Sequence, residues 1–175
     1  MRVAQKVAKP ASYHLPQGFS REIGRIVVHW AFLEHYVQRI VWLLLKVDAK
    51  RGRVAVRDAS MERRIEMIVD LAGIEGIKLE TLDKFPSQTK EAGRRRNLVA
   101  HGLWLEVDGS WYVQDITGVH PQDIKGLLSH KRRIEPGSKK MDMETLRGIT
   151  AEIEQLINRA RLLQQEVSRE RSTSR

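Results

Sequence analysis

The chain contains no cysteine, which excludes a disulfide framework and any metal site built on thiolates. It also lacks a long hydrophobic run, because the longest, residues 40–45, falls far short of the roughly 20 apolar residues that a membrane-spanning helix needs. Residues 1–10 are basic but include no apolar stretch like that of a signal peptide. We therefore expect a cytoplasmic protein that makes no use of a membrane.

Acidic residues are outnumbered by basic ones. Lysine and arginine total 31 against 22 aspartates and glutamates, which gives a net charge of +9 and a pI near 10.1. Such an excess attracts polyanions, and RNA is the expected partner. The same charge also serves simple solubility, so it does not by itself decide between the two.

The apolar pattern predicts one mainly helical domain over residues 19–167, behind an extended arm over residues 1–18. In the arm, Pro10 and Pro16 oppose helix formation. A long first helix is expected to begin at Ser20 as its N-cap, because apolar residues then recur at steps of three and four. These residues are Ile23, Ile26, Val27, Trp30, Leu33, Val37, Ile40, Val41 and Leu44.

Two further helices are predicted after a basic connector over residues 50–58. Ser60 is expected to cap the second helix, and Gly73 or Gly76 to end it. Its inward-facing residues would be Ile65, Ile68, Val69 and Ala72. The third helix should begin near Pro86 or Ser87 and run to His101, with Gly102 as its stop.

A β-hairpin is predicted over residues 103–113, because Asp108-Gly109 separates two β-prone runs and suits a type I′ turn. Residues 118–140 are expected to form a loop. Asp142 should then cap a final helix that ends near Val167, followed by a flexible tail over residues 168–175. The predicted fold class is thus mainly all-α, an up-and-down helical bundle with one small β-hairpin inserted before the last helix.

The most informative stretch lies at the end of the third helix. Asn97 and His101 are four residues apart, so a helix places them within about 40° of each other on one face. Arg96 lies about 140° from His101, and only its long side chain can bring the guanidinium near the imidazole. An imidazole can exchange protons with a ribose 2′-hydroxyl or a leaving oxygen, and a guanidinium can bind phosphate oxygens. A solvated polar face, with His101 interacting with the helix dipole, is the alternative interpretation.

The sequence Arg96-Asn97-x-x-x-His101 resembles the signature of the HEPN superfamily, in which an arginine precedes a histidine by a few residues and a polar residue often follows the arginine. Arg94 and Arg95 also fit the loose spacing, but only Arg96 has asparagine next to it. The resemblance implies a HEPN-like helical bundle, a homodimer with two motif copies facing one cleft, and RNA cleavage without a metal. Many members are toxins, with an antitoxin protein as partner, or act in antiviral defence; others are inactive scaffolds.

Several residues are candidates for supporting roles. Glu34 on the first helix is expected either to pair with the motif arginine or to face solvent. Trp104, Trp111 and Tyr112 are expected to pack within the hairpin or on the bundle rather than to stack on bases. The histidines show no spacing typical of a metal site, and no cofactor is expected. Basic clusters that would track phosphates are Lys131, Arg132, Arg133, Lys139 and Lys140.

Three functions therefore remain open at the level of sequence. The first is a HEPN-like endoribonuclease in which Arg96, Asn97 and His101 are catalytic, with attack by the 2′-hydroxyl and no metal. The second is a dimeric HEPN-like interaction module without activity. The third is a basic nucleic-acid-binding protein that acts through its charged loops.

Overall fold

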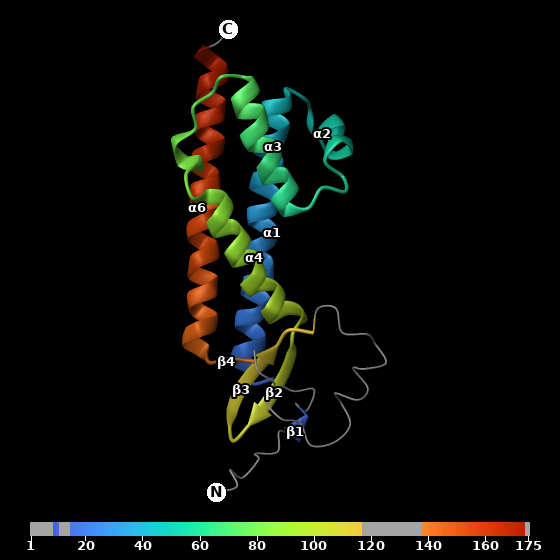
Figure 1. Ribbon diagram of the computed structural model, residues 1–175, viewed down its shortest axis with the longest axis vertical. Coiled ribbons are helices and arrows are strands. Elements are labelled where there is room, and N and C mark those ends of the chain that lie inside the picture. Colours follow the sequence, from blue (N-terminus) through green and yellow to red (C-terminus); the bar gives the residue numbers. More distant parts are fainter. Residues whose placement is uncertain (1–8, 11–14, 117–137, 174–175) are drawn as a thin grey trace, which may run out of the picture. The chain divides into compact units, whose positions relative to one another are not determined.

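The protein, described here from a computed structural model over residues 9–10, 15–116 and 138–173, is mainly helical (Figure 1). A small antiparallel sheet precedes the last helix, which confirms the predicted fold class at this level. The elements are β1 (Lys9–Pro10), α1 (Gln17–Leu45), α2 (Ala49–Ala55), α3 (Met61–Ile74), the 3-10 turn η1 (Glu80–Leu82), α4 (Phe85–His101), β2 (Leu103–Val107), β3 (Ser110–Gln114), β4 (Lys139–Met141) and α6 (Met143–Thr173).

The chain divides into two compact units. The first comprises residues 1–26 and 94–150, and the second comprises residues 27–93 and 151–175. Helices α1, α4 and α6 contribute residues to both units, so a single domain over residues 19–167 stays a prediction. Within the described ranges, none of the helices has the length and apolar character needed to cross a bilayer.

The first unit contains a four-stranded antiparallel sheet in the order β1-β2-β3-β4. The predicted hairpin is confirmed: β2 pairs with β3, and both turn residues, Asp108 and Gly109, have positive φ, at 50° and 70°. The sheet is larger than the hairpin, because β1 pairs with β2 and β4 pairs with β3. Lys139 and Lys140 were predicted to lie in a loop, which is wrong: both belong to β4.

Aromatic and polar contacts hold the first unit together. The ring of Phe19 on α1 meets the edge of Trp104 at 6.0 Å between ring centroids and lies 6.1 Å from Trp111. Glu22, almost fully buried, accepts a hydrogen bond of 2.6 Å from the hydroxyl of Thr150 on α6. This buried pair satisfies both polar groups and ties the start of α1 to the start of α6.

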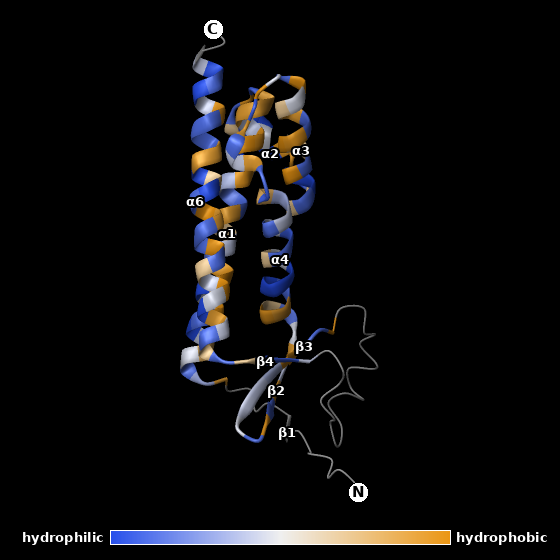
Figure 2. Ribbon diagram, turned by 60° about the vertical axis from the view of Figure 1, so that its left-hand side comes forward, coloured by the Kyte–Doolittle hydropathy of each residue, from blue (hydrophilic) through white to orange (hydrophobic). Residues whose placement is uncertain are grey.

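The second unit buries one apolar stripe from each of its long helices. Figure 2 shows hydrophobic and hydrophilic residues alternating along α6. The buried residues of α1 in this unit are Trp30, Leu33, Val37, Ile40, Val41 and Leu44, and those of α6 are Ile153, Leu156, Ala160, Leu163 and Val167. These positions recur every three or four residues, the spacing of one helical face. Most of the residues predicted for the stripe of the first helix are buried, but Val27, which was included in it, is exposed.

The predicted boundaries of α3 agree with the structure, whereas the predicted start of α1 does not. Ser60 caps α3 by accepting from the backbone N–H of Arg63, and Gly76 adopts positive φ just beyond the end of that helix. Val69, expected to face inward, is exposed. Helix α1 begins at Gln17 rather than after a Ser20 cap, because the carbonyl oxygen of Pro16 accepts the first hydrogen bonds.

Residues 50–58 are not simply a connector, because α2 occupies most of them. Asp48 caps this helix by accepting from two backbone N–H groups, and buried Gly52 lies against the indole of Trp42. A Cβ at Gly52 would collide with that ring. The glycine therefore allows α2 to pack closely on α1.

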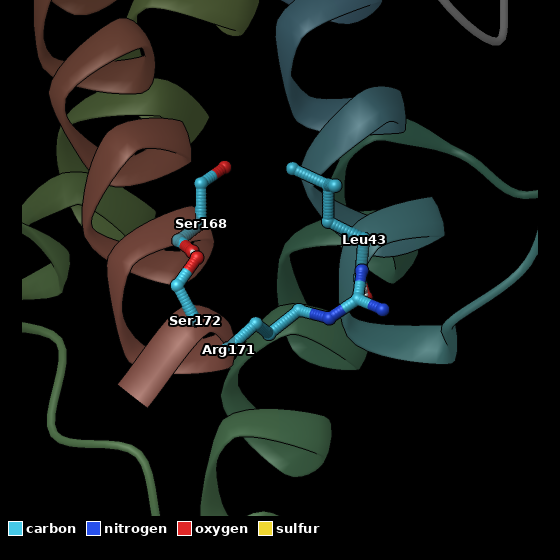
Figure 3. Close-up of a pocket in the computed structure, with 4 residues that line it drawn as sticks. All are labelled: Leu43, Ser168, Arg171 and Ser172. Atoms are coloured by element: carbon cyan, nitrogen blue, oxygen red, sulfur yellow. Dashed lines mark hydrogen bonds between the residues drawn. The ribbon is translucent and has the colours of Figure 1, made fainter. Parts of the chain in front are cut away.

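Helix α6 continues to Thr173 instead of giving way to a tail after Val167. Arg171, beyond the predicted end, extends toward α1 and donates a hydrogen bond of 3.0 Å to the carbonyl oxygen of Leu43 (Figure 3). The hydroxyl groups of Ser168 and Ser172 donate to backbone oxygens of α6 itself. The bond from Arg171 therefore ties the last turns of α6 to α1, although the helix is hydrophilic there (Figure 2).

Candidate functional site

The three motif residues lie at the C-terminal end of α4. Asn97 and His101 are both exposed, and Arg96 is half-buried. His101 is the last residue of the helix, and the next backbone N–H, that of Gly102, still donates to the carbonyl oxygen of Leu98 at 2.8 Å. The imidazole is therefore held at the helix end, beside the carbonyl groups of the last turn.

The guanidinium of Arg96 joins the other two side chains. Its Nη1 donates to Oδ1 of Asn97 at 2.9 Å and lies 3.5 Å from Nε2 of His101, at the outer limit of a hydrogen bond. A guanidinium can only donate, so a hydrogen bond with His101 forms in the tautomer whose Nε2 carries the lone pair. This contact is compatible with the neutral imidazole that a general base needs. As predicted, the long side chain of Arg96 brings its guanidinium close to the imidazole of His101.

Gly102 fixes the end of the motif helix by close approach rather than by a left-handed conformation. A Cβ at this position would overlap the carbonyl oxygen of Leu98 and lie 3.0 Å from the carbonyl oxygen of Gln114 on β3. The sequence predicted Gly102 as a helix stop. A usual C-cap glycine is needed because it adopts a left-handed conformation. Gly102 is needed because backbone atoms of α4 and β3 leave no room for a side chain.

Trp104 anchors the same helix end to the sheet. Its indole N–H donates to the carbonyl oxygen of Val99 at 3.1 Å, and its ring meets Phe19 edge-on. Trp111 contacts the same phenylalanine. The packing interpretation of these two tryptophans therefore agrees with the structure. Phe19 was not identified from the sequence as a packing residue. Its position directly before the expected N-cap, Ser20, could have indicated this, because an apolar residue there often packs against the start of a helix.

The other candidate residues are distributed over the fold. Arg94 and Arg95 are exposed on α4, directly before the motif. Glu34 accepts a hydrogen bond of 2.8 Å from the indole N–H of Trp30 on its own helix. Glu34 and Arg96 belong to different units, so their predicted salt bridge stays a prediction.

The basic clusters expected to bind phosphate fall into two groups. Lys139 and Lys140 are exposed on β4, a strand at the edge of the sheet. Lys131, Arg132 and Arg133 lie outside the described residues. Among the residues that are described, no group of three or more histidine or acidic side chains is arranged to hold a metal ion.

The chain was compared with protein-family models, with curated proteins and with solved structures, and none of the three comparisons found a match. The HEPN resemblance therefore stays a prediction that depends on the motif itself.

Proposed function

We propose that this protein is a HEPN-like RNA-binding protein that cleaves single-stranded RNA without a metal. The observation that carries the proposal is the contact of one guanidinium, that of Arg96, with both the amide of Asn97 and the imidazole of His101. A cation, an amide and an imidazole at one exposed helix end can supply charge stabilisation, an orienting group and one proton acceptor for phosphodiester cleavage by a 2′-hydroxyl.

Each residue has a role in that reaction. Once the guanidinium of Arg96 has turned from Nε2 to the phosphate, His101 takes the proton of the 2′-hydroxyl at that nitrogen as this oxygen attacks the phosphorus. Arg96 binds the phosphate oxygens and stabilises the negative charge that develops on them. Asn97 orients the guanidinium through its Oδ1. The bond to the 5′-oxygen breaks, which leaves a 2′,3′-cyclic phosphate and a 5′-hydroxyl.

The proposed reaction also calls for a second proton carrier. A single histidine cannot act as base and acid in the same step, because the leaving 5′-oxygen needs a proton while the 2′-hydroxyl loses one. A two-fold dimer that brings two copies of His101 to one cleft supplies both groups. The proposal therefore includes a homodimer as the active form.

A series of alanine variants tests the assignment of roles. Because a positioned histidine typically contributes about 10² to 10⁴ in rate, His101→Ala should lower cleavage by that factor and leave RNA binding nearly unchanged. Arg96→Ala should weaken both binding and cleavage, since a phosphate clamp acts in the ground state and the transition state. Asn97→Ala should reduce cleavage less than either. Rates are measured with a fluorescent RNA oligonucleotide, and affinities by anisotropy.

Arg94→Ala and Arg95→Ala are the matched controls, because both residues are exposed arginines on the same helix. They should lower binding slightly and leave the cleavage rate of bound RNA unchanged. Cleavage by His101→Ala at the wild-type rate would contradict the catalytic proposal. If the wild type cleaves nothing and His101→Ala loses the dimer, the motif serves assembly, and the non-catalytic interaction module is the correct function.

A further inference from the structure

A pocket of about 480 Å³ lies in the second unit, where α1 and α2 meet. Helix α1 contributes His35, Gln38, Arg39 and Trp42 to its wall, and α2 contributes Arg53. Its volume falls in the range of about 300–1,000 Å³ that ligand-binding pockets usually have. The pocket shares no residue with the motif on α4, so it bears on a different property of the protein.

The wall of this pocket is cationic. Arg39 and Arg53 are exposed, and they come from two different helices. His35 adds an imidazole to the wall, and the described residues that line the pocket include no aspartate or glutamate. The carboxylate of Asp48, which stands between the lining residues Val47 and Ala49, is engaged in the N-cap of α2. Two guanidinium groups around a concave surface whose lining holds no carboxylate favour an anionic ligand.

The position of α2, and hence of Arg53, is fixed by packing. Trp42 lines the pocket and lies against Gly52, where even a Cβ would collide with the indole ring. The indole N–H of Trp42 is buried, and no acceptor for it is present in the described part of the chain. The two arginines are thus presented by a rigid pair of helices rather than by loops.

An apolar surface on α1 leads into the pocket. Val28, Phe32, His35 and Arg39 follow one another at steps of four, three and four residues, which places them within about 60° on one helical face. The side chains of Val28 and Phe32 are 53% and 55% exposed, so they form an uncovered apolar patch. The same face is therefore apolar at one end and basic at the other.

We propose that this face of α1, together with the pocket, binds an acidic, amphipathic segment of a partner protein. A carboxylate of the segment lies between Arg39 and Arg53, and its apolar side chains cover Phe32 and Val28. Charge complementarity selects the acidic end, because bidentate guanidinium–carboxylate pairing is directional. The apolar end distinguishes such a segment from a free anion, which would leave Phe32 uncovered. This inference does not depend on the proposed ribonuclease activity.

The test is a selection from a random library of 12-residue peptides on the immobilised wild-type protein. Enriched peptides should combine aspartate or glutamate with leucine, phenylalanine or another large apolar residue. For a synthetic peptide of the enriched sequence, Arg39→Ala and Arg53→Ala should each weaken binding about tenfold, as expected for loss of a charge-assisted pair. Phe32→Ser should also weaken binding of this peptide. Replacing aspartate and glutamate in the peptide with asparagine and glutamine should weaken binding as much as the arginine variants do.

Arg51→Ala is the matched control, because Arg51 is an exposed arginine on α2 that does not line the pocket. It should bind the peptide as the wild type does. No enrichment of acidic, apolar peptides would overturn the proposal. It would also be overturned if Arg39→Ala and Arg53→Ala lowered the affinity for single-stranded RNA as much as that for the peptide, because the pocket would then belong to an RNA-binding surface.

Discussion

At the junction of α4 and β2, one glycine decides how the motif is presented. Gly102 follows His101 directly and has the carbonyl oxygens of Leu98 and Gln114 as close neighbours. Both are backbone atoms, so neither can move aside without a shift of the helix or of β3. The position of the His101 imidazole therefore depends on Gly102, a residue without a side chain.

Gly102→Ala is expected to lower the free energy of unfolding by about 1–3 kcal/mol, the usual cost of forcing an added group into a packed site. The reason is that the new Cβ would overlap the carbonyl oxygen of Leu98 and lie only 3.0 Å from that of Gln114. Gly148→Ala is the control, since nothing lies within 4 Å of a Cβ there. In the interior of α6 that change should raise stability by about 0.5–1 kcal/mol. Urea unfolding followed by circular dichroism measures both, and equal effects of the two variants would contradict the packing argument.

Much of the motif's geometry could be predicted from helical spacing. Asn97 and His101 share a face because they are four residues apart, and Arg96 reaches them because its side chain is long. The surroundings of Gly102 and the contact of Phe19 with Trp104 could not be predicted. Both depend on how a distant segment packs against the helix end, which local spacing does not determine.

At the scale of the element, the start of α6 depends on a single carboxylate. Oδ1 of Asp142 accepts a hydrogen bond of 2.7 Å from the backbone N–H of Thr145, as an N-cap does. Hydrogen bonds from Thr145, first from its backbone N–H and then from its side chain, hold the pKa of Asp142 below its usual value of 3.8. The ionised form therefore stabilises the folded state above that value, and the stabilisation is lost as the pH falls through the lowered pKa.

Asp142→Asn keeps a hydrogen-bond acceptor at the cap and removes the charge. At neutral pH the wild type should melt at a higher temperature than this variant, because its carboxylate also interacts with the N-terminus of α6. The difference should shrink as the pH is lowered below 3.8. Thermal unfolding at a series of pH values measures it. A difference that stays constant down to the lowest pH would contradict the assignment of the charge to the cap.

The elements that the sequence predicted are those with a strong local signal. Helices α1 and α6 have apolar stripes, α3 and α6 have capping residues, and the hairpin has Asp108-Gly109. Helix α4 has few apolar residues and was predicted from Pro86 at its start and Gly102 at its end. Helix α2 was missed because it is short and basic, and its only buried residue is Gly52, which has no apolar side chain to mark it. Strand β4 was missed because three residues become a strand only through pairing with β3.

At the scale of the whole molecule, the active form is expected to be a homodimer. The proposed reaction needs two copies of His101, and a two-fold axis supplies them without further residues. Light scattering at micromolar concentration should give about twice the chain mass of 20.2 kDa. A monomer over the whole concentration range in which RNA is cleaved would exclude the paired mechanism.

The excess of positive charge also acts at this scale. Under the proposed function, a net charge of +9 would speed association with RNA from any direction, whereas the motif would act only on RNA that is already bound. Binding and cleavage are therefore separable properties, and RNA binding alone would not establish the enzymatic function. The enzymatic function is established only by showing which bond of the RNA is broken.

The most direct measurement of the proposed function is the mass of the RNA products formed by the wild-type protein in excess EDTA. The mechanism predicts fragments that end in a 2′,3′-cyclic phosphate, each matched by a fragment with a 5′-hydroxyl, and it predicts their absence with His101→Ala. Fragments with a 3′-hydroxyl and a 5′-phosphate would contradict it, because attack would then have come from water and not from the 2′-hydroxyl. Loss of all cleavage in EDTA would contradict it equally, since the proposed reaction uses no metal.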